Sequence, residues 1–335
     1  MTIVFGWGEL FALSSAICWA TAVILYKAAG ESLTAHSLNL AKNLVGILFL
    51  VPTAFFVHGF DWPSLSGWHW AILIASGYFG IAVADTWYLQ ALRTLGAGRT
   101  AIIASLYSPF VVLLAIIFLG ERLVGWQWLG FVLVLLGILT VVYQRHYSEL
   151  DRATLTKGLT FASASVFLTA AGVVAMKPIL AADGFFWIVA LRLLAGTAGM
   201  VLLLMVRGRL SHFVSEVQDG EHRWPTIMTA GFIGTYLALI FWLAGFKYAD
   251  ASVASVLNET ANVFIVIMAF VFLGEALSRR RMAGIAPTFY GVLLFLGVLT
   301  GSLCNTTLHL PCPVLPEARS ARPAPSYHTH RHQHP

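Results

Sequence analysis

Long apolar runs, each close to twenty residues, follow one another along almost the whole chain, with short polar segments between them. A membrane-spanning helix needs about 20 mainly apolar residues, whereas a barrel strand needs only about ten of alternating polarity. The pattern therefore predicts an all-α integral membrane protein with ten transmembrane helices, at residues 8–27, 34–57, 69–92, 98–119, 124–143, 157–179, 184–206, 225–246, 251–273 and 282–302.

Composition supports a membrane location. Hydrophobic residues make up 59% of the chain and charged residues 10%, and the mean hydropathy is +0.80. Soluble domains carry roughly 25% charged residues. The net charge of +5 does not indicate nucleic-acid binding, because the basic residues lie singly or in short groups between apolar runs, where they flank helices and meet lipid headgroups. We expect a multi-pass protein of the plasma (inner) membrane.

The composition changes after Gly301. Residues 303–335 are rich in proline and histidine and end in YHTHRHQHP, which predicts a disordered tail. The alternating histidines of this tail could hold a metal ion, but a flexible tail or a sequence artefact is the simpler interpretation. The three cysteines form neither a disulfide framework nor a zinc pattern. We therefore predict no metal site and no cofactor.

One short word occurs twice, as FLGE at 118–121 and again at 272–275, and it closes a long apolar run each time. The offset of 154 also aligns the glycines that follow, 130 with 284 and 137 with 291. Upstream, an offset of 150 aligns Lys42 with Arg192. The two offsets differ by four residues, and we assign this difference to the loops between the helices.

The chain is therefore predicted to hold two copies of a five-helix unit, at residues 1–146 and 154–302, joined by a linker at 147–153. An odd number of helices in each copy makes the second copy enter the membrane from the opposite side. Such an inverted-topology repeat is typical of secondary transporters, which bind their substrate near the midplane between the copies.

This arrangement resembles the drug/metabolite transporter superfamily, EamA type. The resemblance rests on ten helices as five plus five and on a Leu-Gly-Glu word that ends the fourth helix of each half, with its repeat signature at Gly120, Glu121, Gly274 and Glu275. It implies a solute carrier for amino acids, metabolites or drugs that works by alternating access and is commonly an exporter.

Four ionisable residues lie deep in the predicted helices, roughly 12–13 Å from the nearer helix end at 1.5 Å per residue: Lys42, Asp85, Arg192 and Glu259. Charges at this depth are costly, so they indicate a functional site. Lys42 and Asp85 lie at similar depth, as do Arg192 and Glu259. In a polar cavity the cations would attract a carboxylate or phosphate and the acids would take up protons. The structural alternative is two buried ion pairs that fix helix register.

Neutral polar and aromatic side chains extend this candidate site. Ser252, Ser255, Glu259 and Asn262 are spaced 3, 4 and 3, so they share one helical face. The further candidates for lining a solute pathway are Asn258, Asn262, Asn39, Tyr88 and Trp19. The small residues of these helices are better explained by close helix packing.

Glu121 and Glu275 are interpreted as structural residues. An acid at a helix C-terminus opposes the helix dipole, so each needs a partner such as a helix N-terminus or a backbone N–H. The glycines that follow are predicted to be helix-packing positions, at Gly130, Gly137, Gly284 and Gly291.

The sequence thus predicts a secondary transporter of a small-molecule solute in a lipid bilayer, driven by a proton or solute gradient, with no catalytic residues. It has no GxxxxGK[ST] loop for ATP. The alternatives are a channel and an intramembrane lipid-modifying enzyme, although HExxH and GxSxG motifs are missing from the sequence. The fifth and tenth helices could pack between protomers of a homodimer.

Overall fold

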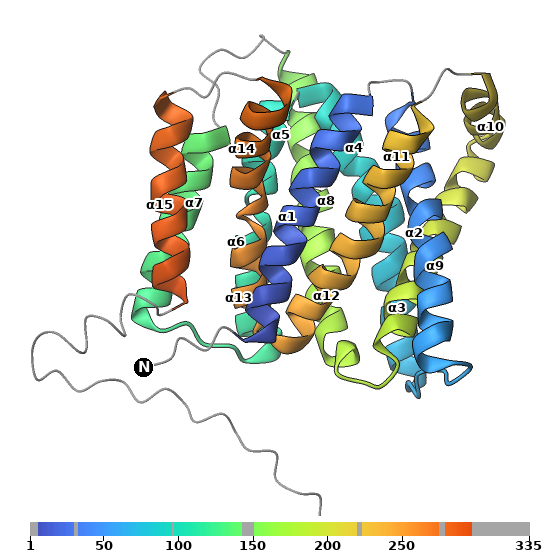
Figure 1. The fold of residues 1–335 in the computed structure, drawn as a ribbon, viewed down its shortest axis with the longest axis horizontal. Helices are drawn as coiled ribbons and strands as arrows, with labels where there is room; N and C mark the ends of the chain where they lie inside the picture. Colours follow the sequence, from blue (N-terminus) through green and yellow to red (C-terminus); the bar gives the residue numbers. More distant parts are fainter. Residues whose placement is uncertain are drawn as a thin grey trace, which may run out of the picture.

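The computed structural model of the chain describes residues 6–29, 33–95, 97–142, 151–219, 223–274 and 279–296. Within these residues the fold is all-helical (Figure 1). Eight of the described helices are long and apolar enough to cross a membrane, and two further apolar helices, Gly125–Thr140 and Met282–Phe295, are shorter. The all-α membrane class is confirmed. The predicted tail at 303–335 lies outside the described residues.

Six of the described helices that follow the apolar runs are continuous. They are α1 (Trp7–Ala29), α2 (Ala35–His58), α7 (Gly125–Val142), α8 (Arg152–Leu180), α9 (Phe185–Val206) and α15 (Arg279–Phe295). Short polar side chains set two of the starts. Thr34 accepts a hydrogen bond from the Ser37 backbone N–H, and Asp151 accepts one from Thr154, which is how N-cap residues satisfy the free N–H groups of a first turn.

Two of the described spans contain a π-helical segment near the middle. One consists of α3 (Gly67–Gly77), η1 (Tyr78–Ala84) and α4 (Asp85–Leu95), and the other of α11 (Trp224–Gly231), η3 (Phe232–Leu237) and α12 (Ala238–Tyr248). Tyr78 and Phe232 are 154 positions apart, the offset of the sequence repeat. Single π turns inside helices occur frequently at functional sites.

Two other spans are divided into separate helices. One consists of α5 (Ala97–Ala104), α6 (Tyr107–Leu114) and the π-helical η2 (Ala115–Leu119), and the other of α13 (Ala251–Asn258) and α14 (Ala261–Leu273). The first break lies at 105–106 and the second at 259–260, again 154 positions apart. Gly120 and Gly274 then end both spans in the left-handed conformation, with φ of 68° and 66°, which glycine adopts without steric cost.

The connection at 207–224 contains a helix that the apolar pattern did not predict. This helix, α10 (Leu210–Asp219), lies at one rim of the molecule (Figure 1). Its Glu216 carboxylate accepts hydrogen bonds from the Thr34 hydroxyl at 3.0 Å, from the Thr34 backbone N–H and from the Ser37 hydroxyl. A charged segment is therefore ordered here because it caps the start of α2.

Helices α7 and α15 pack against each other at one edge of the molecule (Figure 1). A Cβ atom at Gly137 would lie 2.7 Å from the backbone oxygen of Gly284, and one at Gly130 would lie 2.7 Å from that of Gly291. Backbone atoms of the two helices therefore approach closely at this contact, together with the Thr288 side chain. The predicted packing role of these glycines is confirmed.

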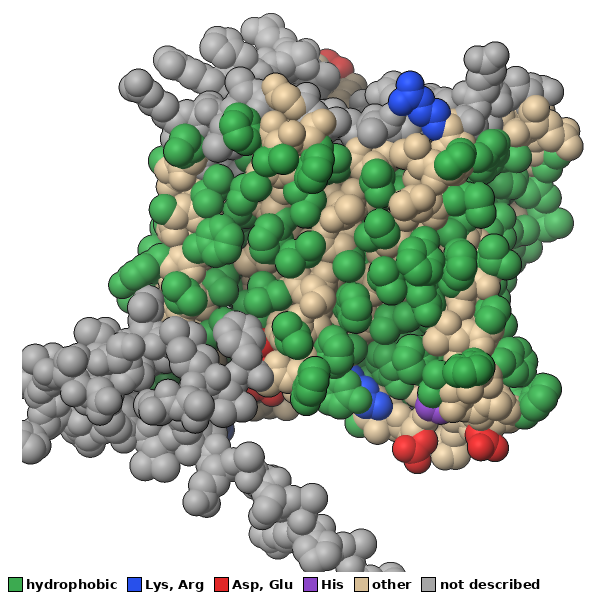
Figure 2. All heavy atoms as spheres, viewed as in Figure 1, with side chains coloured by type: hydrophobic (Ala, Val, Ile, Leu, Met, Phe, Trp, Pro, Cys, Tyr) green, Lys and Arg blue, Asp and Glu red, His purple; other side chains and the backbone are tan. Residues whose placement is uncertain are grey.

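The surface carries a wide apolar band. Figure 2 shows hydrophobic side chains covering the middle of the visible face, with the coloured charged groups at its two rims. Large side chains stay open to the outside, such as Phe56 at 93% and Phe118 at 72% exposure. Exposed apolar area of this extent needs lipid around it. The protein is an integral, multi-pass membrane protein.

Candidate functional site

The first pair of deep charges is joined in the structure. Lys42 on α2 places its Nζ 3.5 Å from a carboxylate oxygen of Asp85, the first residue of α4 after the π-helical segment η1. The Lys42 ammonium also donates to the Asn43 side-chain oxygen at 3.4 Å. The two side chains are partly accessible, at 18% and 37%. The contact joins α2 to α4, as expected for an ion pair that fixes how two helices pack against each other.

Glu259 lies at the break between α13 and α14 and meets the matching break on the other divided span. Its carboxylate accepts hydrogen bonds from the Ser108 backbone N–H at 3.3 Å and from the Asn262 side-chain amide at 3.1 Å. Ser108 belongs to the first turn of α6, whose N–H groups have no partner within their own helix. Glu259 is 5% exposed. Among the described residues, no cation lies within 4 Å of it.

Arg192 is the second buried charge that forms no ion pair within 4 Å in the described part of the chain, although Asp85 is a charge of opposite sign that acts on it. It lies on α9, is 2% exposed, and donates from Nε to the Ser76 hydroxyl at 3.3 Å. Its guanidinium lies over the Trp242 ring, 5.3 Å from the centroid. No described carboxylate comes within 4 Å. The structure therefore forms one of the two ion pairs of the structural alternative, Lys42 with Asp85, and leaves Arg192 and Glu259 unpaired.

Several polar atoms around these two charges are buried and lack a partner in the described part of the chain. They include the Tyr107 hydroxyl, the Ser108 hydroxyl and the Asn258 side-chain nitrogen. Tyr107 lies near both Glu259 and Arg192. Tyr88 lies on α4, three residues after Asp85, and near Glu259. The centre of the molecule is thus polar and incompletely hydrogen-bonded.

The remaining candidates divide between this centre and its periphery. Asn262 donates to Glu259, as the helical spacing predicted, and Asn258 directly precedes Glu259 in the chain. Asn39 is buried on α2 and donates to the Met200 sulfur at 3.6 Å. Trp19 is 42% exposed, so the structure gives it no buried place in the site.

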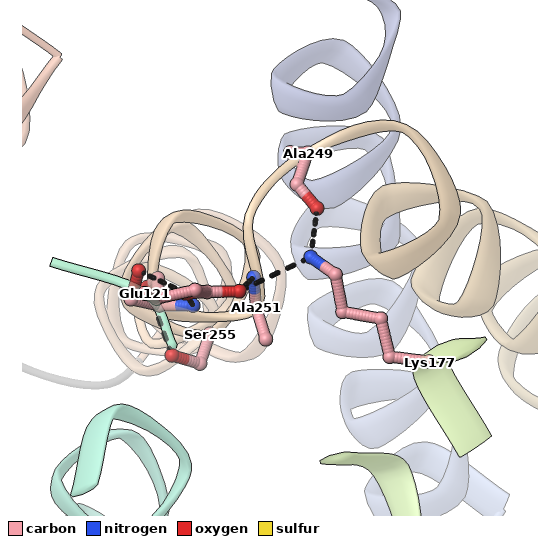
Figure 3. Close-up of polar contacts among 6 residues, drawn as sticks. Glu121, Lys177, Ala249, Ala251 and Ser255 are labelled. Atoms are coloured by element: carbon pink, nitrogen blue, oxygen red, sulfur yellow. Dashed lines mark hydrogen bonds and ion pairs between the residues drawn. The ribbon is translucent and has the colours of Figure 1, made fainter. Parts of the chain in front are cut away.

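Glu121 forms a separate cluster at the start of α13 (Figure 3). Its carboxylate accepts hydrogen bonds from the backbone N–H groups of Ala251 at 2.6 Å and Ser252 at 3.0 Å, and from the Ser252 hydroxyl at 2.7 Å. Lys177 bridges from this carboxylate, at 3.2 Å, to the Ala249 carbonyl oxygen. Glu121 thus has the helix N-terminus that its position requires. It caps α13 although Asp250 holds the N-cap position and makes no capping bond.

These contacts also fix the charge state of Glu121. Burial raises the pKa of its carboxyl group, but the hydrogen bonds from Ser252 and Ala251 and the charge of Lys177 outweigh burial. The resulting pKa lies below the usual value. Glu121 is therefore a carboxylate at neutral pH, and the dipole of α13 favours that charge. Its repeat partner Glu275 lies outside the described residues.

Comparison with known proteins identifies the family. The model of the EamA-like transporter family matches the chain twice, over residues 6–143 and 156–297. The chain belongs to the EamA-like transporter family. Its general role is therefore the transport of a small molecule across a membrane.

Relatives of this EamA-like protein agree with that role. An uncharacterized transporter of Archaeoglobus fulgidus is 22% identical over 287 residues, which cover 86% of this chain and 97% of the relative. Protein PecM of Dickeya dadantii is 23% identical, over 68% of this chain and 74% of PecM. A solved crystal structure superposes with a TM-score of 0.72 at 18% identity, over 88% of this chain and 98% of that one. This likeness shows the fold.

The structure of the EamA-like protein adds site residues that sequence reasoning did not select. Tyr107 and Ser76 contact or approach the buried charges, and Lys177 completes the Glu121 cluster. Lys177 carried a signal, because the repeat aligns it with Lys27. Tyr107 and Ser76 carried no signal, because the helix break that precedes Tyr107 is visible only in the structure.

Proposed function

We propose that this EamA-like protein is a secondary transporter that exports a small metabolite, amino acid or drug-like solute from the cell across the plasma membrane by alternating access. The observation that carries the proposal is the pair of buried and unpaired charges, Arg192 and Glu259, among polar atoms without partners. Unpaired charges are expensive inside a membrane, so their presence favours a function over a packing role.

Two inverted halves would provide the two states that alternating access requires. The π-helical segments, the helix breaks and the glycine caps recur at one offset of 154, which supports the repeat. Helix contacts recur in the same way: α1 packs on α12 and α14, as α8 packs on α4 and α6. In this proposal residues 1–146 and 154–302 exchange conformations, and the solute binds between them.

The named residues have different roles in the proposed cycle. Glu259 takes up and releases a proton, because it is buried, lacks a cation partner and lies at a helix break where small movements change its surroundings. Asp85 is the second proton-binding acid, and it takes up a proton when its ion pair with Lys42 breaks. Arg192 anchors the solute, and Asn39, Asn258, Asn262 and Tyr88 line its path. Trp19 is not needed in this role.

Flux measurements on purified protein in proteoliposomes test the proposal. Labelled amino acids, nucleotide precursors and organic cations are supplied one at a time, with and without a pH gradient. We expect saturable flux of one solute class that accelerates when the gradient is imposed. Single-channel currents would instead identify a channel, and flux that ignores the gradient would remove the proton from the proposal.

A further inference from the structure

Two arginines follow the end of α9, at the rim of the molecule that carries α10 (Figure 1). Arg207 comes directly after the last residue of α9, and Arg209 comes directly before α10. Both side chains are exposed. In the described part of the chain, neither guanidinium has a carboxylate within 4 Å or a side-chain hydrogen bond. Two permanent positive charges therefore lie two residues apart at the end of a membrane span, with no partner in this part of the protein.

A tight turn fixes the backbone that carries these arginines. Gly208 has a φ of 63°, the left-handed conformation that commonly ends a helix. The backbone N–H groups of residues 207, 208 and 209 donate to carbonyl oxygens in the last turn of α9, at 3.1, 3.0 and 2.8 Å. Because backbone donors satisfy these carbonyl groups, the two guanidinium groups are not needed to cap the helix and remain available to a ligand.

The arginines border a narrow hollow where three helices meet. Its apolar wall belongs to α9, and His36 of α2 and Thr86 of α4 add polar atoms to the lining. The residues just before Arg207 are apolar and open to the outside, with Met205 at 58% and Val206 at 79% exposure. A cationic edge thus lies next to an apolar surface that faces lipid, which matches the two chemical parts of a phospholipid.

We propose that this hollow and its two arginines bind an anionic phospholipid, with the phosphate on the guanidinium groups of Arg207 and Arg209 and an acyl chain along Met205 and Val206. A guanidinium binds phosphate through paired N–H donors. The span of α9 ends at Val206, so the arginines lie at the depth of the lipid headgroups. A zwitterionic lipid would leave the two positive charges uncompensated, so an anionic headgroup is preferred. This binding does not depend on transport.

Thermal unfolding of the purified protein in detergent measures the binding. Phosphatidylglycerol, which is anionic, is compared with phosphatidylcholine of the same acyl chains, and inorganic phosphate and glycerol 3-phosphate are each added alone. A ligand that binds the folded protein raises the unfolding temperature. We expect phosphatidylglycerol to raise it more than phosphatidylcholine does, and the two soluble phosphates to have little effect. A shift with inorganic phosphate as large as that with phosphatidylglycerol would identify a site for free phosphate and overturn the proposal.

Matched variants distinguish a site from diffuse attraction of charge. The double variant Arg207→Gln/Arg209→Gln should lose most of the shift that is specific to phosphatidylglycerol. The control is Arg152→Gln/Lys157→Gln, which removes two exposed positive charges near the start of α8. Because α8 and α9 are consecutive antiparallel spans, these charges lie at the same rim. The control should keep the shift. An equal loss in both variants, or an undiminished shift in the arginine variant, would overturn the proposal.

Native mass spectrometry gives a second measurement, which does not depend on stability. Wild type and the control variant should each retain phosphatidylglycerol in preference to phosphatidylcholine when the detergent is removed in the gas phase, and the arginine variant should not. Retention of both lipids to the same extent by all three proteins would show that the arginines select no headgroup, and the proposal would be wrong.

Discussion

At the scale of single residues, the Arg192 guanidinium lies close against a glycine. A Cβ atom at Gly80, within the π-helical segment η1, would lie 3.1 Å from a terminal nitrogen of Arg192. Because Gly80 has no side chain, the guanidinium can occupy the space next to its backbone. The polar centre therefore depends on a residue with no chemistry of its own, which no pattern of charged residues would have indicated.

Gly80→Ala should reduce transport several-fold while the protein remains folded. The added methyl group displaces the Arg192 guanidinium, and small misplacements of a binding group cost much activity. Gly172→Ala is the matched control, because the nearest atom to its Cβ would be 3.7 Å away. Flux assays on both variants, with size-exclusion profiles to verify folding, check the prediction. Equal flux in the two variants would contradict it.

Glu121→Gln should destabilise the protein by about 1–3 kcal/mol, since hydrogen bonds to a charged group weaken and Lys177 loses its counter-ion. Thermal unfolding in detergent measures the effect. Asp151→Asn is the control, because Asp151 also accepts a helix N-terminal N–H but is exposed. A loss no larger than that of the control would show that the Glu121 cluster is incidental.

The same carboxylate should make stability depend on pH. Because the pKa of Glu121 is lowered on folding, its contribution is complete above the unfolded pKa of about 4.3 and is lost as the pH falls through the lower folded value. Neighbouring Asp250 has a raised pKa, from burial and from the charge of Glu121, and its contribution has the opposite sign. Because the Glu121 charge also shifts the pKa of Asp250, the Glu121 part is isolated by comparing proteins with and without Glu121→Gln in an Asp250→Asn background. A difference that stayed constant down to acid pH would refute it.

At the scale of elements, eight of the ten apolar runs correspond to described helices long and apolar enough to cross a membrane, because lipid imposes both length and polarity, whereas the other two correspond to shorter described helices. The interruptions were not predicted. A π-helical segment such as Tyr78–Ala84 changes only the register of backbone hydrogen bonds, and its composition stays apolar. Helix α10 was also missed, since it is stabilised by Glu216 capping a distant helix rather than by an apolar run.

The sequence predicted which ionisable residues belong to the candidate site, but it did not predict which of them form ion pairs. Depth along the helices selected Lys42, Asp85, Arg192 and Glu259, because ionisable residues are rare in apolar runs. Depth also suggested two similar pairs. Whether two side chains at one level meet depends on the rotation of each helix, which the sequence does not specify. Only the Lys42 and Asp85 side chains come within pairing distance.

The contact between α7 and α15 should be sensitive to any added side chain. Gly137→Ala would place a Cβ atom 2.7 Å from the Gly284 carbonyl oxygen, which forces the helices apart and should cost about 1–3 kcal/mol. Gly125→Ala is the control, because nothing lies within 4 Å of its Cβ position. Thermal unfolding of both variants checks the prediction, and equal stabilities would contradict it.

At the scale of the whole molecule, equivalent loops of the two halves should lie on opposite sides of the membrane. Asp61, between α2 and α3, and Ser211, in α10, are exposed and differ by the repeat offset of 150. Figure 1 places the α2–α3 connection and α10 at opposite rims.

Cysteine labelling in intact cells tests this arrangement. In a background without the native cysteines, Asp61→Cys and Ser211→Cys should react with an impermeant maleimide from opposite sides. One of the two should therefore be labelled before cell lysis and the other only after it. Labelling of both from the same side would exclude inverted halves.

Transport through the buried Glu259 is tested by counterflow of the transported solute in proteoliposomes, with wild type and Glu259→Gln compared at equal amounts of folded protein, with and without a pH gradient. We expect saturable flux in wild type that responds to the gradient and is lost in the variant. Flux that is equal in both proteins, with the same response to the gradient, would contradict it and return Glu259 to a structural role.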